Sequence, residues 1–425
     1  AGGTQFANPL EVAATDDERY AYHLGQICGR EGRAVGVNWS FAPIIDIDYN
    51  YHNPITNTRT FGSDPDRVLR MAKEYMRGIK ESNLAVSIKH WPGDGVDGRD
   101  QHLLASVNSL SVEEWDATYG KIYAGMIDAG ARTVMSAHIM LPEYSRKLRP
   151  GIKDEDILPA SLAEELNVDL LRGKLGFNGL IVSDATPMAG FNASLPHAIA
   201  VPQMIAAGVD VFLFSINIHQ DFQYMLDGIE KGILTKERVD EAVTRILALK
   251  ASLKLHEKQA AGTLVPDESA LENLGSVEHK AWAKDCADQG VTLVKDTQNL
   301  LPLDPTQHKR VLLYVLGDNG GFMGHGNRIS PYFIERLNAE GFEVTPFDYE
   351  ALRGPGGWGN PAARDPLGYL AQYDIVLYLA NLSTASNQTT VRINWGQPMG
   401  VDVPKFVHDI PTLFVSVANP YHLQD

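Results

Sequence analysis

Cysteine is scarce in this chain, and its scarcity excludes several kinds of protein. Only Cys28 and Cys286 occur among 425 residues, so at most one disulfide is possible and no CxxC metal motif exists. The 13 histidines include neither an HExxH motif nor a regular pair with metal-ligand spacing. We therefore expect no metal ion and no other cofactor.

Positive charge and long apolar runs are also scarce. The chain has 37 Lys and Arg against 53 Asp and Glu, and this net charge of −16 opposes binding to nucleic acid or to an anionic membrane surface. No apolar run is long enough to span a bilayer, and residues 1–5 show no start of a signal peptide. These absences favour a cytoplasmic location, although the chain begins as if in the middle of a fold.

The composition, with 44% hydrophobic and 21% charged residues, suits two globular domains. Residues 1–256 alternate short apolar runs with segments of helical period, which indicates βα units and a parallel sheet. The predicted strands are Val37–Ile45, Leu84–Lys89, Thr133–His138, Leu180–Asp184 and Val209–Phe214. The predicted helices include Arg67–Ser82, Val112–Ala129, Pro202–Ala207 and Lys236–Leu253, the last with Thr235 as its N-cap.

Polar residues end four of these strands: Asp46, the pair Lys89 and His90, His138, and Asp184. In a (β/α)8 barrel the active site is built at the carboxyl ends of the strands. The pattern therefore predicts an α/β fold of the (β/α)8 TIM-barrel type. Only five strands are visible, so either the sheet is open or three βα units precede Ala1.

A second domain is expected after a linker at residues 257–290, which lack strand character. Residues 291–425 carry another αβ pattern, which predicts an αβα sandwich. Its predicted strands are Val311–Leu316, Glu343–Pro346, Ile375–Ala380 and Thr412–Val417, with a helix at Ile329–Glu340 and a Gly/Pro-rich loop at Arg353–Gly368. The chain stops soon after the last strand, which leaves open that this domain is incomplete.

The loop Lys89–His102 follows the second predicted strand and is the segment densest in reactive side chains. It holds three Gly, one Pro, three Asp and two His, and a solvated surface loop is the simple alternative. Residues two apart point the same way in an extended chain. We therefore expect Asp100 to hydrogen-bond one ring nitrogen of His102 and to leave the other nitrogen free for proton transfer.

A carboxylate also ends the apolar strand Leu180–Asp184. Burying a charge there is costly unless it is paired or used. Asp184 is therefore either a helix N-cap or structural ion-pair partner, or a nucleophile able to attack an anomeric carbon. Arg59 follows in a loop after Asp46, and its fork of donors suits sugar hydroxyls, although alone it would be an ordinary surface arginine.

Together these segments resemble glycoside hydrolase family 3, in the branch of the NagZ-type β-N-acetylglucosaminidases. That branch carries a loop of the form K-H-F-P-G-H-G-D-T-x-x-D-S-H, and this chain has K-H-W-P-G-D-G-V-D-G-R-D-Q-H at the same length. The resemblance implies that Asp100 and His102 are the acid/base pair. It also implies that Asp184, in Gly179–Met188, is the nucleophile. The implied substrate-binding residues are Lys89, His90, Arg59, Asp46 and Met188.

The implied activity is that of a retaining β-N-acetylhexosaminidase, which removes terminal β-linked N-acetylglucosamine from a glycan or cell-wall fragment. Phosphate can compete with water in such an enzyme, because a neutral imidazole repels an anion less than a carboxylate does. The alternatives are a β-glucosidase or β-xylosidase of the same family and a non-catalytic sugar-binding protein. Asp94 and Val96-Asp97 depart from the branch within the loop, which bears on substrate choice. The oligomeric state is not predicted.

Overall fold

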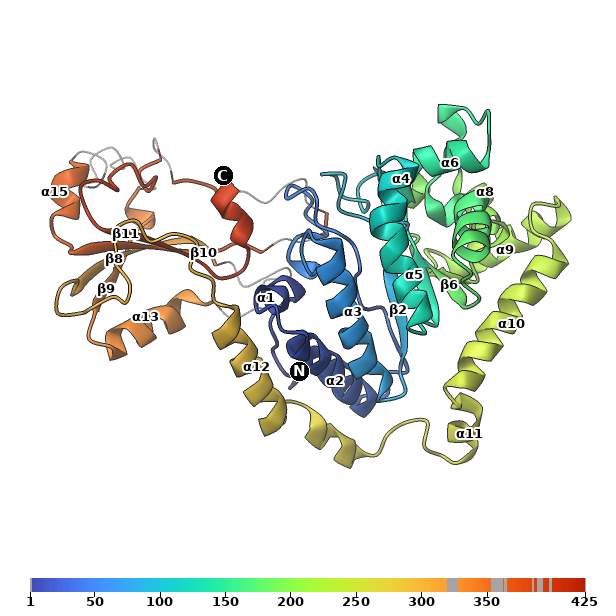
Figure 1. Ribbon diagram of the computed structural model, residues 1–425, viewed down its shortest axis with the longest axis horizontal. Coiled ribbons are helices and arrows are strands. Elements are labelled where there is room, and N and C mark those ends of the chain that lie inside the picture. Colours follow the sequence, from blue (N-terminus) through green and yellow to red (C-terminus); the bar gives the residue numbers. More distant parts are fainter. Residues whose placement is uncertain are drawn as a thin grey trace. The chain divides into compact units, whose positions relative to one another are not determined.

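The protein is described here by a computed structural model that covers residues 2–318, 328–352, 362, 365–383, 386–387, 393–396 and 400–424. The chain forms two compact units, Ala1–Thr292 with Ser386–Thr389, and Leu293–Ala385 with Thr390–Asp425 (Figure 1). Within the described ranges, no helix has both the length and the apolar character needed to cross a membrane.

The first unit is built on a sheet of five parallel strands in the order β1-β2-β4-β6-β7. These are β1 Trp39–Ser40, β2 Ala85–Trp91, β4 Thr133–Ser136, β6 Leu180–Ala185 and β7 Val211–Leu213. Two further short strands, β3 Ser106–Val107 and β5 Ile139–Met140, pair with each other. Strand order therefore follows chain order, which is the arrangement of a TIM-type barrel domain, and the predicted fold class is confirmed.

The first predicted strand is much shorter than expected. Only Trp39–Ser40 form a ladder with β2, and an isolated bridge joins Ile44 to Lys89. Pro43 lies between these two pairings and has no N–H to donate, which interrupts the ladder.

Helices separate the strands along the chain. They are α1 Pro9–Ala14, α2 Glu18–Ala34, α3 Pro65–Lys80, α4 Val112–Trp115, α5 Lys121–Asp128, α6 Pro142–Leu148, α7 Ala189–Asn192, α8 His197–Ala206, α9 Ile218–Glu230, α10 Lys236–Ser252, α11 Leu255–Ala260 and α12 Val277–Gly290. Short 3-10 helices are η1 Asn57–Arg59, η3 Asp154–Asp156, η4 Ala160–Leu162 and η6 Glu268–Asn273, and π-helical segments are η2 Asp116–Gly120 and η5 Glu165–Lys174.

Several of these helices match the predicted ones. A π-helical turn joins α4 to α5, so the predicted helix Val112–Ala129 contains a change of helix type. Thr235 caps α10 as predicted, because its side chain accepts from the N–H of Arg238 at 3.2 Å. The segment predicted as a linker contains α12, which packs against α1 and α2.

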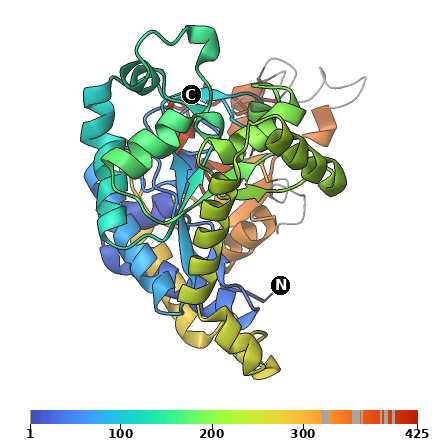
Figure 2. The same ribbon diagram turned by 90° about the vertical axis from the view of Figure 1, so that its right-hand side faces the viewer.

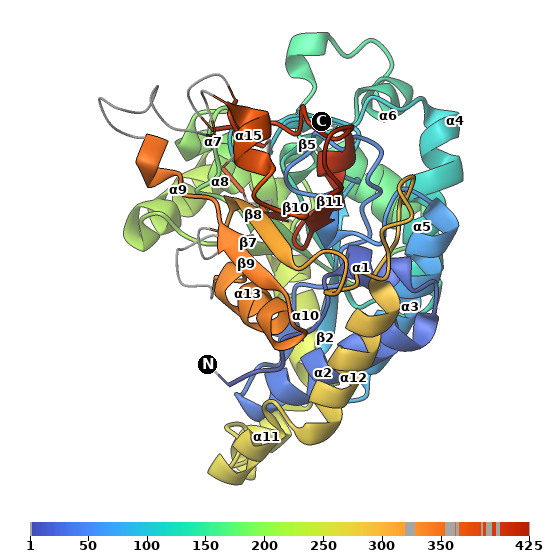
Figure 3. The same ribbon diagram turned by 90° about the vertical axis from the view of Figure 1, so that its left-hand side faces the viewer.

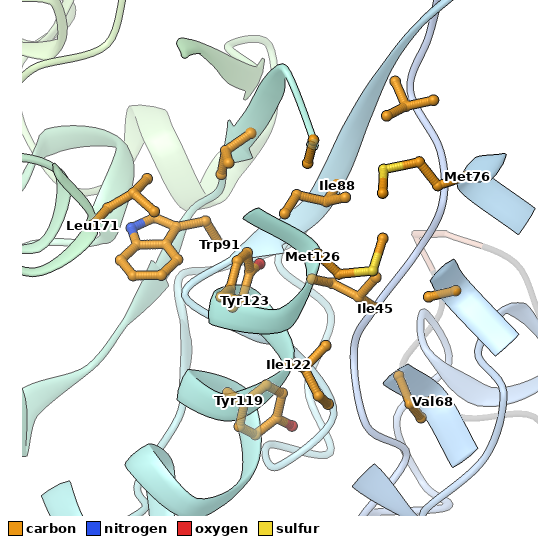
Figure 4. Close-up of a cluster of buried hydrophobic side chains, with 14 of the residues drawn as sticks. Ile45, Val68, Met76, Ile88, Trp91, Tyr119, Ile122, Tyr123, Met126 and Leu171 are labelled. Atoms are coloured by element: carbon orange, nitrogen blue, oxygen red, sulfur yellow. The ribbon is translucent and has the colours of Figure 1, made fainter. Parts of the chain in front are cut away.

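The largest core lies where β2 meets α3 and α5. Figure 4 shows Trp91 of β2 against Tyr123 of α5, and their rings meet edge to face at 4.8 Å between centroids. Ile88 and Met126 are fully buried in the same cluster. Each such side chain contributes roughly 1.5–3 kcal/mol through burial. This packing fixes the end of β2, from which the Lys89–His102 loop leaves.

Another cluster covers further residues of the sheet. Met135 of β4 and Val182 of β6 pack with Ile246 and Leu249 of α10. Figure 2 shows α10, in yellow-green, running alongside the strands. Because residues of β4 and β6 lie in both clusters, β4 and β6 are held from both sides.

The second unit holds a four-stranded parallel sheet in the order β11-β10-β8-β9. Its elements are β8 Arg310–Gly317, β9 Glu343–Pro346, β10 Ile375–Asn381, β11 Thr412–Ser416, α13 Ser330–Ala339, α15 Pro366–Leu370, and the 3-10 helices η7 Glu350–Leu352 and η9 Pro420–Gln424 (Figure 3). Alternate residues of β8 face opposite sides: Leu312 packs with Leu370 of α15, and Leu313 packs with Phe333 of α13. The unit is therefore an αβα sandwich, as predicted. Most of the predicted loop Arg353–Gly368 lies outside the described residues.

Candidate active site

The polar residues predicted at the strand ends are brought together in the first unit. Asp184 lies on β6, Lys89 and His90 lie on β2, and His138 follows β4. Asp184 interacts electrostatically with all three of these cationic or titratable side chains. The carboxyl ends of neighbouring parallel strands thus form one site, as expected for a barrel domain.

Asp184 is held as a carboxylate. Burial raises its pKa, but electrostatic interactions with the neighbouring His90 and His138 oppose burial, and the pKa is lowered below the ordinary value. The N–H of Ala185, which donates to Oδ1 at 2.7 Å, and the ammonium of Lys89 lower it further. An ionised, half-buried carboxylate is competent to attack an electrophilic carbon.

Asp100 and His102 form the pair that the sequence predicted. Oδ1 of Asp100 accepts from the backbone N–H of His102 at 2.8 Å and lies 2.7 Å from its Nδ1. The Asp100 side chain is buried, whereas 27% of the His102 side chain is exposed. The carboxylate therefore holds Nδ1 and leaves Nε2 as the nitrogen for proton exchange.

The expectation that Asp100 and His102 lie in an extended segment was wrong. Residues 101–103 form a turn and not an extended segment, and the N–H of Leu103 donates to the carbonyl of Asp100 at 2.9 Å. The Asp100 side chain reaches the N–H two residues ahead, which is the geometry of an Asx turn. The pairing is thus local, and a compact turn holds it.

His90 forms a second Asp–His pair, with Asp46. Oδ2 of Asp46 lies 2.6 Å from Nδ1 of His90, and Oδ1 accepts from the backbone N–H groups of His90 at 3.0 Å and Asp94 at 2.8 Å. Asp46 was predicted to bind substrate, and the structure shows that both its oxygens hold other protein groups. Burial lowers the pKa of His90, and the nearby Asp46 opposes this shift.

Lys89, Arg59 and Met188, the other predicted substrate-binding residues, lie in the same unit. Burial lowers the pKa of Lys89, and the like charge of Arg59 adds to the lowering while Asp184 opposes it. Arg59 ends η1 and donates from Nη1 to the carbonyl of Ile55 at 3.0 Å. Met188 is buried, at the N-cap position of α7. Contact of these three residues with a sugar stays a prediction.

His138 was noted at a strand end but was not assigned a role. Its Nε2 lies 3.0 Å from the carbonyl oxygen of Ala185, and its Nδ1 lies 2.9 Å from Oγ of Ser161. A carbonyl only accepts, so Nε2 carries the proton, and burial lowers the pKa of the ring. The neutral ring therefore donates to the peptide that follows Asp184. The sequence could have indicated a place for His138 in the site, because a histidine that follows an apolar strand of a barrel lies at the active-site end.

Two glycines allow the Lys89–His102 loop to fold tightly. Gly95 has φ of +106°, and a Cβ there would collide with the carbonyl of Ile47. Gly93 has φ of +123°, and a Cβ there would collide with the ring of Tyr119. The turn formers of this loop therefore meet a steric demand of the site. Among the residues that the structure describes, no group of three or more His, Cys, Asp or Glu is arranged to hold a metal ion.

A parallel barrel-type sheet that carries an ionised carboxylate and an Asp–His pair at its strand ends has the nucleophile and the acid/base group that a retaining glycosidase needs. The model of the glycosyl hydrolase family 3 N-terminal domain matches residues 1–249, and the chain belongs to this family. The resemblance read from the loop and from the Asp184 segment is thus confirmed for the family.

The similar proteins carry more than one activity in their names. The chain is 51% identical over 424 residues to a β-N-acetylglucosaminidase/β-glucosidase of Cellulomonas fimi, with 99% of this chain and 73% of that protein covered. It is 27% identical over 321 residues to β-hexosaminidase A of Pseudoalteromonas piscicida, with 71% and 51% covered. The solved structure of the β-glucoside phosphorylase BglX matches with a TM-score of 0.92 and 48% identity, over 100% of this chain and 74% of that one.

Proposed function

We propose that the chain carries a retaining β-N-acetylhexosaminidase that removes terminal β-linked N-acetylglucosamine through a covalent glycosyl-enzyme. The observation that carries this proposal is the partly exposed His102, whose Nδ1 lies 2.7 Å from Asp100, in the same unit as the ionised Asp184. A retaining glycosidase needs one nucleophile and one group that acts first as acid and then as base. Asp184 and His102 supply these two roles.

In the first step Asp184 attacks the anomeric carbon while the bond from that carbon to the departing oxygen breaks. His102 gives its Nε2 proton to that oxygen, and Asp100 stabilises the imidazolium before transfer. In the second step His102 takes a proton from water, the water oxygen bonds to the anomeric carbon, and the bond to Asp184 breaks. Two inversions give net retention. Lys89, His90 and Arg59 are the proposed partners of the ring hydroxyls.

A histidine base also affects which acceptor enters the second step. Once His102 has lost its proton it is neutral, so it repels a phosphate anion less than a carboxylate base would. The phosphate oxygen can then bond to the anomeric carbon in place of water and release a sugar 1-phosphate. The name of the 48% identical structure, a β-glucoside phosphorylase, favours this second activity for the present chain.

β-Glucoside cleavage is the second candidate. It is favoured by the names of the 51% identical relative and of the BglX structure, which include β-glucosidase and β-glucoside phosphorylase. Asp94 stands where the N-acetylglucosaminidase loop has histidine, so the loop itself differs from that branch. We therefore propose that the site accepts glucose in addition to N-acetylglucosamine.

Trapping the glycosyl-enzyme tests both proposals. The full-length protein is incubated with a fluorinated N-acetylglucosamine donor or a matched fluorinated glucose donor, and the adduct is located by peptide mass spectrometry. We expect the adduct on Asp184, and its absence from Asp184→Asn. An adduct on another carboxylate would overturn the nucleophile assignment, and trapping by glucose alone would overturn the hexosaminidase proposal. Sugar 1-phosphate yield in phosphate buffer, against a sulfate buffer of equal ionic strength, tests phosphorolysis.

A further inference from the structure

A buried polar contact lies beneath the acid/base turn and has no part in the mechanism above. Asp94 and Gln101 belong to the same loop, and only 2% and 0% of their surfaces are exposed. Nε2 of Gln101 donates to Oδ2 of Asp94 at 3.2 Å. Burying both groups is costly unless their hydrogen bonds are satisfied, so each contact around them is informative.

Asp94 acts throughout as an acceptor. Its Oδ1 accepts from Nδ2 of Asn53 at 2.9 Å and from the N–H of Gly95 at 2.7 Å. Because Oδ2 accepts from Gln101, the orientation of the Gln101 amide is set: Nε2 faces Asp94 and Oε1 faces elsewhere. The carboxylate thus selects one of the two amide orientations.

The other end of the Gln101 amide reaches the next strand. Its Oε1 accepts from the backbone N–H of His138, two residues after the end of β4, at 3.1 Å. His138 in turn contacts the carbonyl of Ala185, next to Asp184. A continuous chain of hydrogen bonds therefore runs from the loop carboxylate to the peptide beside the nucleophile.

Gln101 lies between Asp100 and His102 in the chain. Contacts that fix the Gln101 side chain therefore also fix the turn formed by Asp100–His102. We propose that Asp94 and Gln101 form a buried clamp that positions the Asp100–His102 turn relative to the end of β4 and thereby to Asp184. The clamp acts through His102 and contacts no substrate, so both are positioning residues. This inference rests on the proposed acid/base role of His102.

Both members of the clamp differ from the loop form that this chain resembles. That form has histidine at the position of Asp94 and serine at the position of Gln101. A carboxylate and an amide have replaced them, and these two replacements contact each other in the structure. The departure of Asp94 from the branch is thus accompanied by a second departure, Gln101, that it contacts.

The electrostatics of Asp94 make the clamp sensitive to a change of charge. Burial and the neighbouring Asp46 raise its pKa to about 8, while the donors Gly95 and Asn53 oppose the rise. A proton on Oδ2 would face the Gln101 amide as a second donor, so the hydrogen bonds described here are those of ionised Asp94 and are complete only above this pKa. Asparagine at position 94 reproduces this neutral state without changing the shape.

A swap of the two groups tests the clamp. In Asp94→Asn two amide NH2 groups face each other, and in Gln101→Glu two carboxylates do. In the double variant Asp94→Asn/Gln101→Glu, the new amide can donate to one oxygen of the new carboxylate while the other accepts from His138. The formal charge of the pair is then the same as in the natural chain.

The readout is kcat/KM, measured above pH 8 where Asp94 is ionised and differs from asparagine, on β-N-acetylglucosaminides with a poor or a good leaving group, since only the poor one needs protonation. We expect each single variant to lose roughly 10- to 100-fold on the poor leaving group and little on the good one, as a misplaced acid would. The double variant should recover most of the loss. Losses that add in the double variant, or that are equal for both leaving groups, would overturn the clamp.

A further variant keeps the test decisive if a charged variant does not fold. Gln101→Met has nearly the same shape, removes both hydrogen bonds and adds no charge, so it should show the same dependence on leaving group. His102→Ala is measured in parallel. If His102→Ala shows no such dependence, the acid/base assignment and the clamp both fail. If His102→Ala shows the leaving-group dependence and Gln101→Met does not, only the clamp is overturned.

Discussion

Two Asp–His pairs of the first unit, Asp46–His90 and Asp100–His102, share one chemistry and differ in access. In each pair a buried aspartate holds both the backbone N–H and Nδ1 of its histidine. The side chain of His90 is 5% exposed, whereas that of His102 is 27% exposed. Only a ring with an open edge can exchange a proton with substrate and water, so pairing alone does not identify an acid/base residue.

The two pairs also differ in what their aspartate supports. Asp46 joins His90 to the N–H of Asp94, so it ties the end of β2 to the loop that follows. Asp100 closes one turn around His102, and its Oδ2 also accepts from the backbone N–H of Asn387 at 2.6 Å. The Asp46–His90 pair therefore holds the backbone of the site in place, and the Asp100–His102 pair lies in the loop that this backbone supports.

His102→Ala should give the largest change. We expect kcat/KM to fall roughly 10²- to 10⁴-fold on substrates with poor leaving groups, because general acid catalysis is worth about that much. On an activated aryl leaving group the first step should remain fast. Turnover should then be partly restored by azide, a small anion that needs no base to attack the glycosyl-enzyme.

The matched control is the histidine of the buried pair. His90→Ala should lower activity without dependence on the leaving group and without azide rescue, because its ring is closed to proton exchange. If it showed both signatures, the division between scaffold and acid/base pair would not hold.

The second largest effect is expected on stability. Asp46→Ala leaves three donors unpaired in a buried environment: the two of His90 and the N–H of Asp94. We expect a loss of roughly 3–5 kcal/mol in the free energy of unfolding, measured by urea denaturation. Asp100→Ala also frees three donors, the two of His102 and the N–H of Asn387, but should cost less stability, about 1–2 kcal/mol, because water can reach His102 and the exposed Asn387. Equal losses in the two variants would contradict the comparison.

The pH dependence of the free energy of unfolding should reveal the titration of Asp94, whose backbone N–H is bound by Asp46. The pKa of Asp94 is raised to about 8 by burial and by Asp46, whereas an unfolded aspartate titrates near 3.9. Between these values the native protein holds a proton that the unfolded chain has released, so this group makes stability fall as pH rises. Subtracting the Asp94→Asn stability curve from that of the natural chain isolates the effect, because Asp46 and Arg59 are present in both. A difference that is flat from about pH 4 to pH 8 would contradict it.

The sequence predicted one Asp–His pair and missed the other for a physical reason. Asp100 and His102 are two residues apart, and a local turn brings them together. Asp46 and His90 are 44 residues apart, and their contact depends on the pairing of chain around Ile44 with Lys89. Periodicity located the strands and hence the edge where their ends meet, but it carries no information on which side chains touch there.

The same limit applies to the buried contacts behind the Asp100–His102 turn. Gln101 lies within a segment that the sequence marked as reactive, and no local pattern indicates that its amide reaches the N–H of His138. Its partner Asp94 was visible only as a departure from a resembled loop. Such contacts depend on how three strand ends approach one another, which is decided by the packing of the whole core beneath them.

The smallest effect is expected where the loop meets solvent. Arg99 donates to both oxygens of Asp97, but half of its side chain is exposed. Arg99→Gln should therefore change the free energy of unfolding by less than about 1 kcal/mol, since water replaces an exposed partner readily. Asp97 keeps its bond from the N–H of Val107 at 3.0 Å, so the loop retains an anchor. If Arg99→Gln instead reproduced the leaving-group signature of His102→Ala, the acid/base turn would be positioned from its solvent side, and the buried scaffold would not be what holds it.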